Sequence, residues 1–327
     1  MLRFFNSALF SRTLMLVFLA ALLWLPAFLL PAKTIIPEHS APLYQLFLFL
    51  IGNNVYLHLS IAFVLTIVSG LLLNQIATQF GFTEKISQLG TLVYIIFSGA
   101  IVSYTAMSPM VMVNFLMLLI LMPLFKVAES KEPILLTFNT SFILGIAALF
   151  YLPALLFILL LWIALMVFRV SQWRNYAVSL VGILLPFIFV FTWYFWNDQT
   201  PEAYSLFLSS LEFHLPDTTN YSFSDIGIAI ILLLFTLVAV TKTSNSLMEK
   251  NINIRHILRI TMYYLAFVLA LFFSESSADS LLMSVPASLL LASVFSESKN
   301  PKWFERALRL LLLLVLINQY LSLFYAV

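Results

Sequence analysis

Residues 142–196 read FILGIAALFYLPALLFILLLWIALMVFRVSQWRNYAVSLVGILLPFIFVFTWYFW, and this stretch decides the fold class. Two apolar runs flank one short polar turn, Arg169 to Arg174, which holds the only two charges of the stretch. An apolar run of about 20 residues is long enough to cross a hydrocarbon layer about 30 Å thick as an α-helix. We therefore predict a helical hairpin in a membrane, with the turn at a membrane face and Trp173 at headgroup depth.

The composition of the whole chain agrees with this local pattern. Of 327 residues, 62% are hydrophobic and 9% are charged, against about 25% charged in soluble domains. The absence of cysteine excludes disulfides and cysteine metal sites. The four histidines are scattered, and no basic tract is long enough to indicate nucleic acid. We predict one integral-membrane domain over residues 1–327, with membrane lipid as a partner, no nucleic acid, no metal site and no cofactor.

Apolar runs separated by charged or proline-containing breaks predict an all-α polytopic transmembrane helix bundle of about eleven helices. The first run is interpreted as an uncleaved helix rather than as a removed signal peptide. Pro42 to Gly52 is too short to span, so we predict a helix lying flat on the outer face, with a re-entrant element as the alternative. The predicted spans are 13–30, 54–77, 87–105, 109–125, 134–151, 153–169, 175–197, 224–241, 256–274, 278–296 and 304–325.

The basic residues predict how the bundle is oriented. With these spans, fifteen of the sixteen lysines and arginines fall on one side, and Lys33 alone falls on the other. Cytoplasmic loops carry the excess of lysine and arginine. We therefore predict a multi-pass protein of the bacterial inner membrane, with a cytoplasmic N-terminus and a periplasmic C-terminus.

The predicted outer face has the opposite character. Eight carboxylates against Lys33 give this side a net charge of −7. Two outer loops are long, at about 31–53 and about 197–223, and we predict that any outer cavity lies between them. The eight carboxylates are Glu38, Asp198, Glu202, Glu212, Asp217, Asp225, Glu275 and Asp279.

Glu38 and His39 in the first outer loop are the candidate catalytic pair. A carboxylate at a membrane face can deprotonate an acceptor hydroxyl, and an imidazole can move the proton. The alternative is a solvated loop dipeptide with no chemical role.

The second outer loop supplies a candidate binding site made of Glu202, Glu212, His214 and Asp217. Oxygen and imidazole ligands of this kind could hold a divalent cation. The apolar stretch 203–213 resembles a helix lying on the membrane, and the alternative is a surface helix with an acidic rim.

The polar residues noted within the spans carry no charge. Asn114, Asn139 and Asn318 are amides, which most often bond neighbouring helices in a membrane. By these boundaries no acidic or basic residue lies in the middle of a span. This argues against a proton-coupled or ion-coupled pump, whose relay needs a carboxylate inside the membrane.

Four segments resemble known families: LNQIATQFGF (73–82), LGIAALFYLPALLFILLLWIALMVFR (144–169), SQWRNY (171–176) and GILLPFIFVFTWYF (182–195). They resemble an uncharacterised family of polytopic inner-membrane proteins of Bacteroidota. More distantly, their order is similar to that of the GT-C membrane glycosyltransferases. That second resemblance implies a polyprenyl-linked sugar as partner and a first outer loop that bears catalytic acids. Those enzymes have an acidic pair there, whereas this chain has Glu38 alone.

The leading functional hypothesis is therefore envelope glycan or lipid-linked sugar handling on a GT-C-like scaffold, as an enzyme or as a catalytically degenerate subunit. One alternative is a transporter or flippase, which needs a polar path through the bundle, with Asn114, Asn139 and Asn318 as its only candidate lining. Another is a non-catalytic membrane subunit of an envelope assembly, which needs only a tightly packed centre.

Overall fold

The computed structural model describes residues 10–31, 41–52, 54–83, 87–170, 172–209, 223–274, 281–297 and 301–325. Within these ranges every regular element is helical, which confirms the predicted all-α bundle. The thirteen α-helices of the described chain are α2 Phe10–Leu29, α3 Pro42–Ile51, α4 Val55–Gln79, α5 Leu89–Ser98, α6 Pro109–Lys126, α7 Pro133–Phe150, α8 Phe157–Val167, α9 Trp173–Trp196, α10 Thr200–Ser209, α11 Phe223–Ser246, α12 Ile252–Ser274, α13 Ser284–Glu297 and α14 Pro301–Tyr325. Short 3₁₀ turns follow or link some of them at Val102–Thr105, Val127–Glu129, Leu152–Leu156 and Leu247–Glu249.

Six of the described helices are long and apolar enough to cross a membrane, as expected for a multi-pass membrane protein. Each remaining predicted span overlaps a helix that is shorter or more polar, so the total of eleven spans stays a prediction. The six stretches that qualify are Val55–Gln79, Pro109–Glu129, Pro133–Phe150, Trp173–Trp196, Ser224–Glu249 and Ile252–Leu271.

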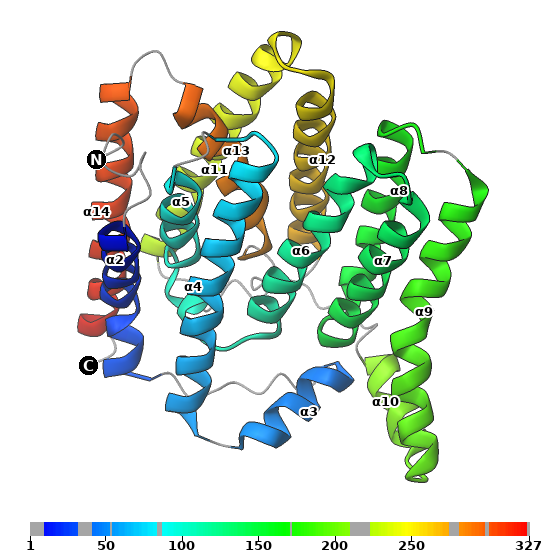
Figure 1. The fold of residues 1–327 in the computed structure, drawn as a ribbon. Helices are drawn as coiled ribbons and strands as arrows, with labels where there is room; N and C mark the ends of the chain where they lie inside the picture. Colours follow the sequence, from blue (N-terminus) through cyan, green and yellow to red (C-terminus); the bar gives the residue numbers. More distant parts are fainter. Residues whose placement is uncertain are drawn as a thin grey trace.

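The bundle has two unlike ends. The connections α4–α5, α6–α7, α8–α9, α11–α12 and α13–α14 lie at the upper end in Figure 1, and we name this the turn end. Helices α3 and α10 lie at the lower end, which we name the loop end. Every lysine and arginine whose side chain is described belongs to the turn-end connections or to the helix turns beside them. They are Lys126, Lys131, Arg169, Arg174, Lys242, Lys250, Arg255, Arg259, Lys302, Arg306 and Arg309.

Two short helices occupy the interior. All ten residues of α5 are buried, as are twelve of the fourteen residues of α13, and the two helices pack against each other. At 1.5 Å per residue, α5 is about 15 Å long, which is half of what a span requires. The predicted span 87–105 is therefore wrong in its bounds, whereas α13 covers most of the described part of the predicted span 278–296. Backbone that leaves the helix at this depth is tolerated only where protein surrounds it.

Helices α7 and α9 make the most extensive pairing in the described bundle, and glycine permits it. A Cβ atom on Gly145 of α7 would lie 2.6 Å from the Ile183 carbonyl oxygen and 3.0 Å from the Pro186 ring of α9. A Cβ atom on Gly182 of α9 would meet Ser141 of α7. Small residues let membrane helices approach closely, so that dispersion contacts hold them together.

Candidate functional site

At the loop end, α3 and α10 lie beside each other below the main bundle. Helix α10 packs on α9, where the Phe207 ring stacks on Phe191 with centroids 4.8 Å apart and lies 5.7 Å from Phe187. Helix α3 contacts both α7 and α10. The two outer segments predicted to border a site therefore meet, and α3 forms where a short outer helix was predicted.

The local sequence explains why α10 folds back on α9. Helix α9 ends at Trp196, and the Asn197 side chain donates to the Trp193 carbonyl oxygen at 2.9 Å. Asp198 follows with φ 55°, in the left-handed region that aspartate tolerates better than most residues. This single left-handed residue reverses the chain, so that α10 starts at Thr200 and runs beside α9.

Helix α3 is attached to the bundle by polar contacts at its two ends. The Tyr44 hydroxyl donates to the Met107 carbonyl oxygen at 3.5 Å, and burial raises the pKa of Tyr44 to about 12, so the hydroxyl keeps its proton. At the other end, the His58 Nε2 atom lies 2.8 Å from the Gly52 carbonyl oxygen. His58 is 2% exposed, and this contact gives it a structural role.

The predicted site residues have no described side-chain geometry. Glu38, His39, Glu212, His214 and Asp217 lie outside the described residues. Glu202 lies in the first turn of α10, which places its backbone at the loop end, but its side chain also falls outside the description. The catalytic and binding assignments at these positions stay predictions.

Apolar side chains are exposed around α3 and α10. Phe49 is 82% exposed, Leu50 73%, Trp196 83% and Tyr204 65%. Large exposed apolar groups on a soluble surface would be costly, but at the edge of a membrane they face lipid. In the described part of the chain, the loop end therefore carries an apolar rim of the kind that lipid can cover.

Inside the bundle, a first polar network ties α6 to α5 and α13. The Asn114 side-chain nitrogen donates to the Ser284 hydroxyl at 2.8 Å, to the Tyr94 hydroxyl at 3.1 Å and to the Leu281 carbonyl oxygen at 3.4 Å. Asn114 is 1% exposed. The contacts with Ser284 and Leu281 connect α6 to the residues where α13 begins in the interior.

A second network contains a buried carboxylate. Asp225, which the sequence assigned to the outer side at the start of the predicted span 224–241, lies in the first turn of α11 and is 7% exposed. The Asn318 side-chain nitrogen donates to Asp225 at 2.7 Å and to the Ala100 carbonyl oxygen at 3.3 Å. A carboxylate at a helix N-terminus is favoured by the helix dipole. Gln319 completes the cluster with a 2.8 Å bond to the Gly99 carbonyl oxygen, just beyond α5.

These two networks were missed because the partners are distant in sequence. Asn114 and Asn318 could be flagged as polar residues in apolar helices, but no pattern pairs Asn318 with Asp225, which is 93 positions away. Asn139, the third amide proposed to line a path, is exposed on α7. The three amides therefore do not line one common polar path through the bundle.

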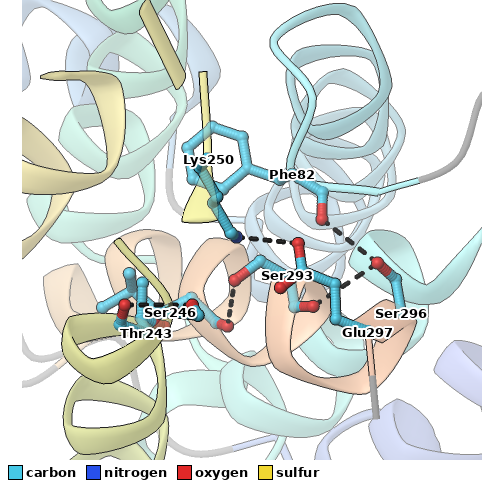
Figure 2. A network of polar contacts seen from close by, with 8 residues as sticks. Phe82, Thr243, Ser246, Lys250, Ser293, Ser296 and Glu297 are labelled. Atoms are coloured by element: carbon cyan, nitrogen blue, oxygen red, sulfur yellow. Dashed lines mark hydrogen bonds and ion pairs between the residues drawn. The ribbon is translucent and has the colours of Figure 1, made fainter. Parts of the chain in front are cut away.

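The turn end has an ionic network of its own, which Figure 2 shows around the end of α13. The Lys250 ammonium lies 2.8 Å from the Glu297 carboxylate, and the Ser296 hydroxyl lies 3.4 Å from the Phe82 carbonyl oxygen. These contacts join the α11–α12 and α4–α5 connections to α13. The network fixes three turns relative to one another.

Comparisons with protein-family models, with curated proteins and with solved structures found no match to this chain. The functional argument therefore depends on the residues and on their geometry.

Proposed function

We propose that this chain handles an envelope glycan or a lipid-linked sugar at the outer face of a membrane, on a GT-C-like helical scaffold. The observation that supports the proposal most directly is the meeting of α3 and α10 across the outer ends of α7 and α9. These two helices belong to the two long segments predicted to lie outside, of which the first contains Glu38 and the second contains four carboxylates. A site formed there would draw on both of them.

The chemistry of a polyprenyl-linked sugar suits this surface. Its hydrocarbon tail lies in lipid, where exposed side chains such as Phe49 and Trp196 form an apolar rim. Its phosphate and sugar lie in water, where carboxylates can hold a divalent cation against the phosphate oxygens. In this proposal Glu38 is the base or the cation ligand and His39 moves the proton, while Glu202, Glu212, His214 and Asp217 bind the headgroup.

Purified protein in nanodiscs, supplied with polyprenyl-phosphate sugars, tests whether the chain binds or transfers such a substrate. Phe49→Ala removes an exposed ring of α3 and should weaken retention of the lipid-linked sugar. Phe18→Ala removes a comparably exposed ring of α2, 68% exposed, and should change nothing. If wild-type protein neither retains nor transfers any lipid-linked sugar, the proposal is wrong.

Glu38→Gln then separates chemistry from binding, because it keeps the size of the side chain and removes its charge. Loss of a required general base costs about 10² to 10⁴ in rate, whereas loss of a solvated carboxylate changes the free energy of unfolding by less than about 0.5 kcal/mol. Asp279→Asn, a predicted outer carboxylate outside both loops, is the control. Unchanged transfer at unchanged protein abundance would exclude an enzyme that depends on Glu38.

A second candidate is a non-catalytic membrane subunit, favoured by the packed interior of α5 and α13. In that case the loop end binds a protein of the envelope. Crosslinking from Tyr204, an exposed residue of α10, in intact cells distinguishes the two candidates. A subunit gives one defined protein adduct and no sugar retention, and a sugar-handling protein gives the reverse.

A further inference from the structure

A buried carboxylate outside the proposed site has no counter-charge in the described part of the chain. Asp225 is 7% exposed, and the Asn318 side chain of α14 donates to it at 2.7 Å. The ion pairs among the described residues do not include it. Burying an ionised carboxylate is costly unless a cation pairs with it. The amide of Asn318 lowers that cost, but it brings no positive charge.

The same Asn318 side chain gives a second, independent indication of a ligand. It is 3% exposed, and its nitrogen donates to Asp225 at 2.7 Å and to the Ala100 carbonyl oxygen at 3.3 Å. Its Oδ1 atom is buried without a hydrogen-bond partner, which is costly. Both nitrogen contacts are to oxygen, so turning the amide over would not remove this cost.

The unpartnered oxygen lies close enough to the carboxylate for both to contact one ion. The oxygen and nitrogen of an amide are about 2.3 Å apart, so Asn318 Oδ1 lies at most about 5 Å from the Asp225 oxygen that accepts its hydrogen bond. Ca²⁺, whose radius is close to that of Na⁺, contacts oxygen ligands at about 2.3–2.6 Å. An ion of this size can therefore bridge the two oxygens.

The interior end of α5 lies beside these two residues. Helix α5 ends at Ser98, and α14 contacts both α5 and α11 on the same side of the bundle (Figure 1). The Ala100 carbonyl oxygen, just beyond this end, already accepts from Asn318 and has a second lone pair. The C-terminal end of a helix carries partial negative charge. In membrane transporters, such helix ends and unwound carbonyl groups coordinate Na⁺.

The charge of this ligand set matches a monovalent ion. Asp225 contributes one negative charge, and the amide and carbonyl oxygens are neutral. The described residues contain no group of three or more histidine, aspartate or glutamate side chains placed to hold a metal ion. The sequence predicted no metal site because cysteine is absent and the histidines are scattered. A monovalent ion held by oxygen ligands needs neither residue.

We propose that Asp225, the Asn318 Oδ1 atom and the Ala100 carbonyl oxygen bind one monovalent metal ion of the size of Na⁺. The ion neutralises the buried carboxylate and joins the interior end of α5 to α11 and α14. None of these residues belongs to the proposed sugar site. Failure of either proposal therefore leaves the other intact.

The test is thermal unfolding of the full chain in detergent micelles, with sodium chloride replacing choline chloride at constant ionic strength. Between about 1 and about 100 mM Na⁺ the wild-type midpoint should rise by about 2–5 °C, because the ion binds the folded state. Equilibrium dialysis with radioactive Na⁺ should find one bound ion per chain.

Asp225→Asn keeps an oxygen that can accept from Asn318 and removes the charge. It should abolish the sodium dependence. In choline alone it should be at least as stable as the wild type, because a neutral amide needs no counter-ion. If the carboxylate only holds Asn318 in place, the variant loses the same stability in both salts, which would overturn the proposal.

Asp198→Asn is the matched control, because Asp198 is an exposed carboxylate with φ 55°, a conformation that asparagine also tolerates. It should keep the sodium response. Equal wild-type midpoints in sodium and choline would overturn the proposal without any variant. The carboxyl group would then be protonated or paired with Lys33, which lies outside the described residues and is the one base that the sequence assigns to this side. Lys33→Gln would lower the midpoint only in the second case.

Discussion

The turn end and the loop end are stabilised by different kinds of contact. At the turn end the connections are short, charges lie near the surface, and an ion pair between Lys250 and Glu297 joins neighbouring turns. Toward the loop end α5 ends inside the protein and α13 begins there, and amides such as Asn114 and Asn318 reach them. Ion pairs thus join the turns that water reaches, whereas side-chain amides, one of them bonded to the buried Asp225, donate to carbonyl oxygens where water is excluded.

The difference shows why the interior helices can be short. An unsatisfied backbone group in hydrocarbon costs several kcal/mol, so a helix normally continues to the membrane surface. A side-chain amide that forms a hydrogen bond with the backbone at the end of a short interior helix removes this cost. The contrast can be tested by removing the contacts that each end depends on and by altering the α7–α9 contact that links the two ends.

The largest effect is expected at Gly145, where α7 touches the backbone of α9. Gly145→Ala should lower the free energy of unfolding by about 1–3 kcal/mol, because the new methyl group would overlap the Ile183 carbonyl and main-chain atoms cannot rotate away. Unfolding in mixed micelles measures the change.

Gly227→Ala is the control for that substitution. Gly227 lies in α11, and a Cβ atom there would have no neighbour within 4 Å. Alanine is about 1 kcal/mol better than glycine in a helix, so this variant should be neutral or more stable. If Gly145→Ala were equally well tolerated, the close approach of α7 and α9 would not contribute to stability.

A smaller loss is expected for the interior amide. Asn114→Leu should cost about 1–2 kcal/mol, since it removes the donor that bonds the Ser284 and Tyr94 hydroxyls from α6, and interhelical bonds in membranes are individually modest. Asn139→Leu changes an exposed amide on α7 and should have little effect. Equal stability of the two variants would contradict the role given to the network.

The smallest effect is expected for ion pairs at the turn end. A double-mutant cycle of Lys250→Met and Glu297→Gln should give a coupling of about 1 kcal/mol or less, because the Glu297 side chain is 46% exposed. The Arg309–Glu305 pair, with Arg309 57% exposed, should give about 0.3–0.5 kcal/mol. A Lys250–Glu297 coupling energy larger than the stability lost in Asn114→Leu would reverse the expected order of the two ends.

Much of the fold could be predicted because the length of an apolar run is read directly from sequence. The helices of residues 142–196, the turn at Arg169 and the short helix α3 all follow from it. The place of each helix could not be predicted in the same way. Residues facing lipid and residues facing other helices are equally apolar, so nothing marked α5 as interior and α9 as largely exposed.

The candidate site was less predictable for a related reason. The sequence assigns Asp225 to the outer side because it stands at the start of the predicted span 224–241, but no sequence pattern shows that it is buried and bonded to Asn318. That partner is on a different helix. Glu38 and His39 lie outside the described residues, so their chemistry still depends on sequence alone.

The central claim is that the turn end faces the cytoplasm and the loop end faces outward. The chain contains no cysteine, so single-cysteine variants give labelling without background. Lys302→Cys places a thiol at the turn end, and Gln199→Cys places one in the α9–α10 connection at the loop end. A membrane-impermeant maleimide applied to cells with a permeabilised outer membrane should label Gln199→Cys and should reach Lys302→Cys only after lysis. Labelling of both before lysis, or of Lys302→Cys alone, would contradict the account.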